Sequence, residues 1–147
     1  MKYRSAAHAM PASSPRVLVV DDCGIMRDVL GMTLRRAGFI VQSASGGRSA
    51  LELARSTHFD AVLADVNMPE MDGLAMLRAL RELPRHLATP VIVLSSHDDP
   101  ARRDEGLKLG ATTWLTKPFT PESIVRVLRA LTARVAEDVT QFQVASP

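Results

Sequence analysis

Short apolar runs alternate with segments of helical periodicity along most of the chain. The apolar runs predict five strands, at residues 16–22, 39–44, 60–66, 89–96 and 112–117. Between and after them, apolar residues at helical spacing predict five helices, at residues 24–39, 47–59, 71–83, 100–110 and 120–139. Strands that alternate with helices in this way predict an α/β fold with a parallel sheet and right-handed crossovers.

Three of the predicted strands are apolar throughout, at residues 17–20, 61–64 and 91–94. Such runs are typical of the centre of a parallel sheet that is covered by helices on both faces. Gly38 and Gly110 predict helix ends, and Thr120 before Pro121 predicts the N-cap of the last helix. In sheets of this kind ligands bind outside the carboxyl ends of the strands, so function is expected there.

The composition is that of an ordinary globular domain, with 147 residues, 46% apolar and 23% charged. The formal charge of +2 is small and the basic residues are scattered, which argues against nucleic acid as a partner. No apolar run is long enough for a membrane span, and the first fifteen residues lack the apolar segment of a signal peptide. We therefore expect a cytoplasmic protein that does not insert into membranes.

The predicted organisation is a flexible tail over 1–14, one domain over 15–135, and the end of the last helix with a C-terminal tail over 136–147. A single cysteine, Cys23, excludes an internal disulfide, and we expect it to be a small packed residue. His8, His58 and His86 lie far apart in the sequence and indicate no metal site.

Polar residues follow four of the five predicted strands. Asp21 and Asp22 end the first strand, Asp65 the third, Ser95 the fourth and Lys117 the fifth. Three converging carboxylates would repel one another unless a cation joined them, and oxygen ligands that are open to water suit Mg²⁺. Lys117 would add a second positive charge and Ser95 a hydrogen-bond donor. The edge is therefore predicted to hold a tetrahedral anion beside Asp65.

Four motifs carry a family resemblance, in the order VVDD, ADVNMPEMDG, VIVLSS and GATTWLTKPF. Together they resemble the response-regulator receiver domains of two-component signalling, over about residues 15–135. The resemblance implies a flavodoxin-like, doubly wound sheet of five strands in the order 2-1-3-4-5, with five helices. GATTWLTKPF is most similar to stand-alone, CheY-like regulators of chemotaxis.

The resemblance assigns chemical roles to the residues at the strand ends. Asp65 would be the phosphoacceptor, and its donor a phosphohistidine on a histidine kinase or a phosphotransfer protein. Asp22 and Asp65 would hold Mg²⁺ (or Mn²⁺) directly with the backbone carbonyl of Asn67, while Asp21 would act through a bound water. Lys117 would pair with the phosphoryl group. Such a protein is a phosphoacceptor that catalyses only its own phosphorylation and dephosphorylation.

The resemblance also implies how phosphorylation would change the structure around the site. Ser95 would donate its hydroxyl to the phosphoryl oxygens, and the peptide bond before Pro118 is expected to be cis. Trp114 occupies the position of a switch aromatic residue, which would fill space vacated when Ser95 and its loop move inward. Asn67 and His97 flank the site at positions that tune the lifetime of the acyl phosphate.

Several functions remain open at this stage. The favoured hypothesis is a stand-alone response regulator that binds a downstream protein, such as a flagellar-motor switch protein. The binding surface would be the face of the fourth helix, fifth strand and fifth helix. A phosphorelay intermediate or phosphate sink is the alternative. A haloacid-dehalogenase-type phosphatase expects a second aspartate two residues after the nucleophile, where this chain has Asn67. A non-phosphorylated pseudo-receiver expects the acidic, hydroxyl or lysine positions to be altered, and all are intact here.

Overall fold

Strands and helices alternate along the whole computed structural model, which describes residues 14–145, with side chains up to Ala133. The strands are β1 (Arg16–Val20), β2 (Ile40–Ala44), β3 (Ala61–Asp65), β4 (Val91–Ser95) and β5 (Thr113–Thr116). The helices are α2 (Gly24–Arg36), α3 (Gly47–Ser56), α4 (Gly73–Leu80), α5 (Pro100–Lys108) and α6 (Pro121–Ala145), with a short 3-10 turn, η1 (Pro84–His86). The tail expected over 1–14 falls outside the described residues, except for Ser14.

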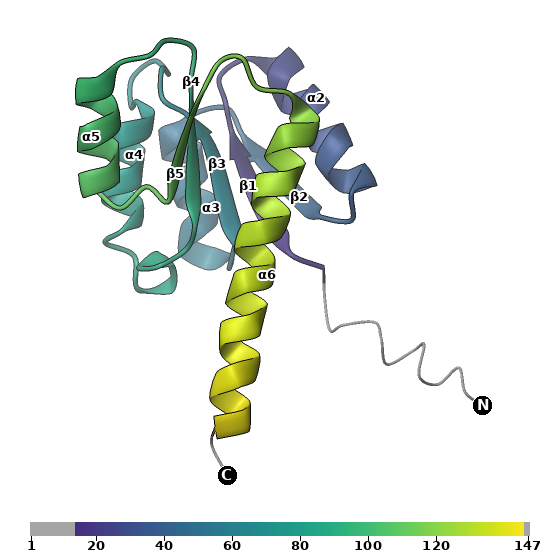
Figure 1. Cartoon of the computed structure of the whole chain (residues 1–147). Coiled ribbons are helices and arrows are strands. Elements are labelled where there is room, and N and C mark those ends of the chain that lie inside the picture. The colour runs from purple at the N-terminus through teal and green to yellow at the C-terminus, as the bar shows by residue number, and fades with distance from the viewer. Residues whose placement is uncertain (1–13, 146–147) are drawn as a thin grey trace.

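The five strands form one parallel sheet in the order β2-β1-β3-β4-β5, which confirms the predicted fold. The strand order reverses beside β1, since β2 pairs with one of its edges and β3 with the other. Parallel pairing brings all five carboxyl ends to one edge of the sheet, the upper edge in Figure 1. That reversal creates the crevice in which sheets of this class bind ligands.

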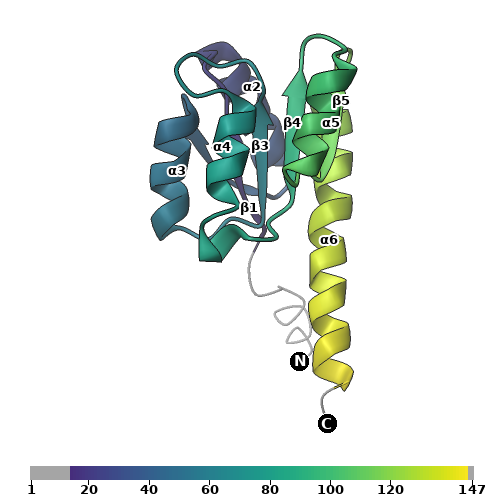
Figure 2. The same ribbon diagram turned by 90° about the vertical axis from the view of Figure 1, so that its left-hand side faces the viewer.

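Helices cover both faces of the sheet, and alternate strand residues enter two separate cores. On one face, Leu18 and Val62 pack with residues of α3 and α4. On the other, Val19 and Leu63 pack with residues of α2 and α6. The two views show α2 and α6 on one side of the sheet and α3, α4 and α5 on the other (Figures 1 and 2). Burial on both sides explains why β1, β3 and β4 read as continuous apolar runs.

The helix ends follow the expected chemistry. Gly38 and Gly110 adopt left-handed backbone angles, with φ of 100° and 104°, just after the ends of α2 and α5. Thr120 caps α6 reciprocally with Ser123: the Ser123 N–H donates to the Thr120 hydroxyl over 3.1 Å, and the Thr120 N–H to Ser123 Oγ over 3.0 Å.

Most differences from the sequence prediction lie at the ends of the elements. The helix expected over 71–83 ends at Leu80, and η1 was not foreseen. α6 continues to Ala145, six residues beyond the expected end, because no glycine or proline interrupts the chain between Glu122 and Ser146. Its last turns extend beyond the sheet (Figure 2). Among the described helices, none is both long and apolar enough to cross a membrane.

Candidate phosphoacceptor site

The sheet brings three carboxylates together at its carboxyl edge. Val20 pairs with Ala64 across β1 and β3, so the residues that follow them lie side by side. One carboxylate oxygen from each of Asp21, Asp22 and Asp65 lies within 4.8 Å of the other two. This is the only such group of acidic, histidine or cysteine side chains in the part of the chain that the structure describes. The predicted convergence at this edge is therefore confirmed.

Burial and mutual repulsion disfavour the charged forms of these acids. Burial raises the pKa of Asp65 to about 6, helped by the negative charges of Asp21 and Asp22 and opposed by the backbone N–H groups of Asn67 and Val66. Burial also raises the pKa of Asp21, although the Cys23 N–H donates to its Oδ1 over 2.9 Å. The ionised site carries excess negative charge.

The donor set fits a hard divalent cation. Its atoms are carboxylate oxygens at a mouth that leaves Asp22 exposed, which is the coordination that Mg²⁺ prefers. Among residues with described side chains, no ion pair joins the three acids to an arginine or lysine. Burial is the largest cause of the raised pKa of Asp65, and the negative charges of Asp21 and Asp22 raise it further. A bound cation would remove that repulsion.

The loop after β3 holds the Asp65 backbone in place through Gly73, a residue that the sequence analysis did not single out. A Cβ on Gly73 would lie 2.6 Å from the carbonyl oxygen of Asp65, so only glycine fits. The Gly73 N–H donates to the Val66 carbonyl over 2.9 Å. Asp72 caps α4 at Ala75 N and pairs with Arg102 of α5 at 3.0 Å. The adjacent Asp-Gly pair was the available signal for this close contact.

Ser95 and Lys117 lie where the sequence placed them, at the ends of neighbouring strands. The Ser95 hydroxyl is buried and donates to the His97 carbonyl over 2.6 Å, while the His97 N–H donates back to it over 3.2 Å. The Lys117 N–H donates to the Ser95 carbonyl over 3.0 Å, and its side chain is exposed. The Lys117–Pro118 bond is cis, as predicted. Asn67 and His97 are both exposed beside the site.

Trp114 already occupies a buried position. The residue is 9% exposed. Its ring packs so closely on Gly106 of α5 that a Cβ there would lie 2.7 Å from ring atom Cζ3. Leu74 of α4 lies against the same position. The indole N–H has no hydrogen-bond partner among the described residues. The ring therefore packs against α5 and α4 in this structure, and its role as a switch residue stays a prediction.

One minor expectation was wrong. Cys23 is exposed at the start of α2 and does not pack in a core. The rings of His58 and His86 stack with centroids 6.2 Å apart, although 28 residues separate them along the chain. The chain folds α3 and η1 against each other, which no local pattern reveals. His8 lies outside the described residues.

Comparison with known proteins places the described geometry in a family. Residues 17–129 match the response regulator receiver domain family. The transcriptional regulatory protein SrrA of Staphylococcus aureus is 38% identical over 141 residues, which cover 88% of this chain and 57% of SrrA. The chain thus spans little more than half the length of these curated relatives.

Solved structures show the same architecture. The chemotaxis protein CheY4 of Vibrio cholerae is 38% identical with a TM-score of 0.78, and the match covers 81% of this chain and 99% of that one. The receiver domain of the sensor histidine kinase PA1611 of Pseudomonas aeruginosa is 26% identical with a TM-score of 0.75, covering 82% and 99%. Its structure holds a magnesium ion in the active site cleft.

Proposed function

This chain belongs to the response regulator receiver domain family, and on that premise we propose that Asp65 accepts a phosphoryl group from a phosphohistidine. The donor would be a histidine kinase or a phosphotransfer protein. The observation that carries the proposal is the convergence of Asp21, Asp22 and Asp65 within 4.8 Å at the carboxyl edge of the sheet. The raised pKa of Asp65 further distinguishes it as the acid whose charge most needs compensation.

The reaction transfers phosphorus from nitrogen to oxygen. A carboxylate oxygen of Asp65 forms the new P–O bond as the N–P bond of the phosphohistidine breaks, and the imidazole leaves with the electron pair. No proton is removed from Asp65, so the residue must be ionised to act. Backbone N–H groups of Val66 and Asn67 lie beside its carboxylate and help to keep it so.

Magnesium fits the acids that surround this nucleophile. Asp22, Asp65 and the carbonyl of Asn67 would hold Mg²⁺, with Asp21 acting through a water molecule. When bound, the ion supplies positive charge that offsets the negative charge of the phosphoryl oxygens. The magnesium in the cleft of the PA1611 receiver domain supports this assignment. Mn²⁺ prefers similar ligands and is an acceptable substitute.

Ser95 and Lys117 would bind the oxygens of the transferred group. The Ser95 hydroxyl has one proton, which it donates to the His97 carbonyl in this structure. Donation to a phosphoryl oxygen therefore requires Ser95 to release His97, and this release would move the loop between β4 and α5. Lys117 supplies an ammonium group from an exposed position that can reach an incoming anion.

Loop movement would reach the output face formed by α5, β5 and α6. Trp114 of β5 packs directly on Gly106 of α5, so a shift of the β4–α5 loop alters the support of that ring. We propose a downstream protein as the target, with a flagellar-motor switch protein favoured by the similarity to CheY4. The equal identity to SrrA favours a second output, transcription control. Binding of each target class to the phosphorylated form would decide between them.

Asn67 and His97 are proposed to tune how long the phosphoryl group persists. Both are exposed next to the site and could shield or orient the attacking water. Replacing His97 with alanine should change the rate of dephosphorylation, followed by loss of label after the donor is removed. An unchanged rate would exclude this role for His97.

Labelling of the purified chain tests the main proposal. In the presence of Mg²⁺ and a small phosphodonor such as acetyl phosphate, intact-mass measurement should show addition of one phosphoryl group. Asp65→Asn should abolish it, whereas the matched control Asp104→Asn, at an exposed position on α5, should label normally. Equal labelling of both variants would refute Asp65 as the acceptor. Continuous release of phosphate from small phosphate esters would instead favour a phosphatase, and transfer to a second histidine protein a relay.

A further inference from the structure

The amino end of α4 contacts both the phosphoacceptor and the output face. At Gly73, the first residue of α4, a Cβ would lie 2.6 Å from the Asp65 carbonyl oxygen. The next residue, Leu74, reaches α5: a Cβ on Gly106 would lie 3.2 Å from Leu74 Cδ2 and 2.7 Å from the Trp114 ring. Two consecutive residues of α4 therefore join the backbone of the reactive acid to α5 and β5.

Asp72, directly before α4, adds a polar contact between α4 and α5. Its Oδ1 accepts from the Ala75 N–H over 2.9 Å, which caps α4, and its Oδ2 accepts from Arg102 Nη2 over 3.0 Å. The side chains of Arg102 and Asp72 are 34% and 40% exposed, so water screens this ion pair only in part. The partners are 30 residues apart in the sequence, whereas the other ion pairs between described side chains span two to five residues.

Other contacts of the same region lie within the loop before α5 and the first turn of that helix. The Arg102 N–H donates to Asp99 Oδ1 over 3.2 Å, which caps α5. Arg103 pairs with Asp98 of the loop at 3.7 Å. These contacts hold the loop and the first turn together as one unit. The Arg102–Asp72 pair differs from them because it ties this unit to α4.

We propose that the Arg102–Asp72 ion pair is a latch, that is, a contact that holds α5 in its unphosphorylated position against α4. This inference rests on the proposed phosphorylation of Asp65, which requires the loop before α5 to move when Ser95 turns to the phosphoryl group. The first turn of α5 moves with that loop. Asp72 stays in place, because it caps α4 and because the adjacent Gly73 packs on the Asp65 backbone. The movement would lengthen the ion pair, so the pair favours the unphosphorylated arrangement.

The latch also affects the surroundings of Trp114. Gly106 lies one turn after Arg102 on α5, and both the Trp114 ring and Leu74 pack on it. A displacement of α5 relative to α4 would change this packing. Loss of the ion pair should therefore alter the environment of the ring even when Asp65 carries no phosphoryl group.

A merely structural ion pair would have different consequences. Its removal would lower the melting temperature and leave the rate of Asp65 phosphorylation unchanged. Removal of a latch increases the fraction of molecules that already adopt the arrangement of the phosphorylated chain. Phosphorylation should then become faster, because less of the population has to rearrange first.

Phosphorylation kinetics of the full chain with Mg²⁺ and acetyl phosphate test the latch. Arg102→Met removes the charge and the donors but keeps an unbranched apolar side chain. It should speed labelling of Asp65 by about two- to fivefold, the range expected for a partly exposed ion pair. Intact mass measured over time gives the rate.

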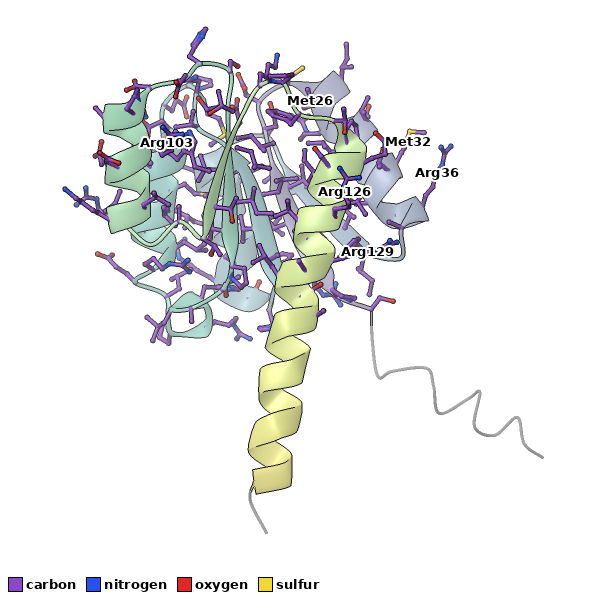
Figure 3. The ribbon with its side chains drawn as sticks, viewed as in Figure 1. Met26, Met32, Arg36, Arg103, Arg126 and Arg129 are labelled. Atoms are coloured by element: carbon purple, nitrogen blue, oxygen red, sulfur yellow. The ribbon has the colours of Figure 1, made fainter. Side chains whose placement is uncertain are left out.

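Arg103→Met is the matched control for this experiment. It makes the same change at the next residue of α5 (Figure 3) but removes an ion pair that lies within the moving unit. It should therefore be labelled at the rate of the parent chain. An unlabelled parent chain would refute the proposed function of Asp65. A labelled parent chain whose rate is matched by Arg102→Met, or exceeded equally by both variants, would overturn the latch alone.

A double-mutant cycle tests the two partners of the latch. Asp72→Asn removes the negative charge and keeps a side chain that can cap α4. It should accelerate labelling as Arg102→Met does, and the double variant should be little faster than either single variant, because each change removes the same contact. Thermal melts check that the variants are folded. Additive acceleration in the double variant would show that the two side chains act separately, which contradicts the latch.

Tryptophan fluorescence tests the link to the output face, since Trp114 is the only tryptophan in the chain. Without a phosphodonor, the emission maximum of Arg102→Met should lie between those of the unphosphorylated and phosphorylated parent chain. Arg103→Met should give the spectrum of the unphosphorylated parent. A spectrum that neither phosphorylation nor Arg102→Met changes would overturn the proposed displacement of α5.

Discussion

Buried polar groups have opposite surroundings at the two edges of the sheet. At the carboxyl edge, Asp21, Asp22 and Asp65 crowd together, and burial raises the pKa of Asp65 to about 6. At the amino edge, His86 is fully buried, and both of its ring nitrogens have hydrogen-bond partners. The acids at the first edge repel one another, whereas the ring nitrogens of His86 at the second edge are both paired. One edge is therefore built to bind and react, and the other to hold the fold together.

The hydrogen bonds of His86 require an uncharged imidazole ring. Its Nε2–H donates to the carbonyls of Ala54 and Thr57, each at 3.1 Å, and its Nδ1 accepts from the Thr89 hydroxyl at 2.9 Å. These bonds tie the end of α3 to η1 and to the segment before β4. Burial lowers the pKa of His86, which is the expected direction for a ring that is kept uncharged.

Arg81 extends this structural cluster toward β5. Its guanidinium donates to the His86 carbonyl over 3.0 Å and to the Gly110 carbonyl over 2.6 Å. Gly110 lies just after α5, so one side chain joins the loops on either side of β4. Like His86, Arg81 donates to backbone carbonyls, so both side chains stabilise the fold.

Asp65→Asn gives the largest expected contrast between the edges. Phosphorylation should be lost completely, because an amide oxygen is a poor nucleophile, while the fold should become more stable at neutral pH without Mg²⁺. Removing a charge that burial and two neighbouring acids disfavour should add about 1 kcal/mol to the free energy of unfolding, allowing for solvent screening. Urea denaturation in EDTA measures this. A less stable variant would show that the crowded acids do not repel in the apo protein.

His86→Leu should have the reverse effect. It leaves the Thr89 hydroxyl and the carbonyls of Ala54 and Thr57 without their partner in a buried site, at a cost of about 2–4 kcal/mol. Labelling of Asp65 below the melting temperature should match the parent chain, because the variant lies at the opposite edge. His58→Leu, at an exposed position, is the matched control and should change stability little. Lost labelling in folded His86→Leu would show that the edges are coupled.

Magnesium should stabilise the fold through residues of the carboxyl edge only. Because the ion binds the folded cluster, saturating Mg²⁺ should raise the free energy of unfolding by about 1–3 kcal/mol, and EDTA should remove this gain. Asp22→Asn removes a proposed ligand and should abolish most of the effect, whereas His86→Leu should retain it. Thermal melts with and without Mg²⁺ measure the difference. An equal gain in Asp22→Asn would place the ion elsewhere.

Much of the carboxyl edge was predictable from the sequence, and little of the amino edge was. The site residues end a strand or follow one within two residues, and parallel strands bring their carboxyl ends together regardless of the loop conformations; these residues are Asp21, Asp22, Asp65, Ser95 and Lys117. The strand order came from the family resemblance. His86 gave no such signal, because its partners Ala54 and Thr57 contribute only backbone carbonyls from a distant part of the chain. The same holds for the Trp114–Gly106 contact, which depends on how α5 packs against β5.

The smallest expected contrast is in the pH dependence of stability. Asp65 and His86, one at each edge, should change the free energy of unfolding in opposite directions as the pH changes. The pKa of Asp65 is raised from 3.8 to about 6 on folding, so its contribution favours the fold below pH 3.8 and is lost as pH rises through 6. The pKa of His86 is lowered from 6.5, so its contribution is present above pH 6.5 and is lost as pH falls through the lowered value.

Between pH 7 and pH 5 the two groups therefore oppose each other in the apo protein. Asp65→Asn should lose more stability on acidification than the parent chain, and His86→Leu should lose less, each by about 1 kcal/mol or less. Urea denaturation in EDTA at several pH values measures both slopes, with His58→Leu as the control for a solvent-exposed histidine. Both variants could instead keep the parent's slope of unfolding free energy against pH. In that case the pKa values of Asp65 and His86 would not differ between the folded and unfolded states, and the contrast between the two edges would rest on packing alone.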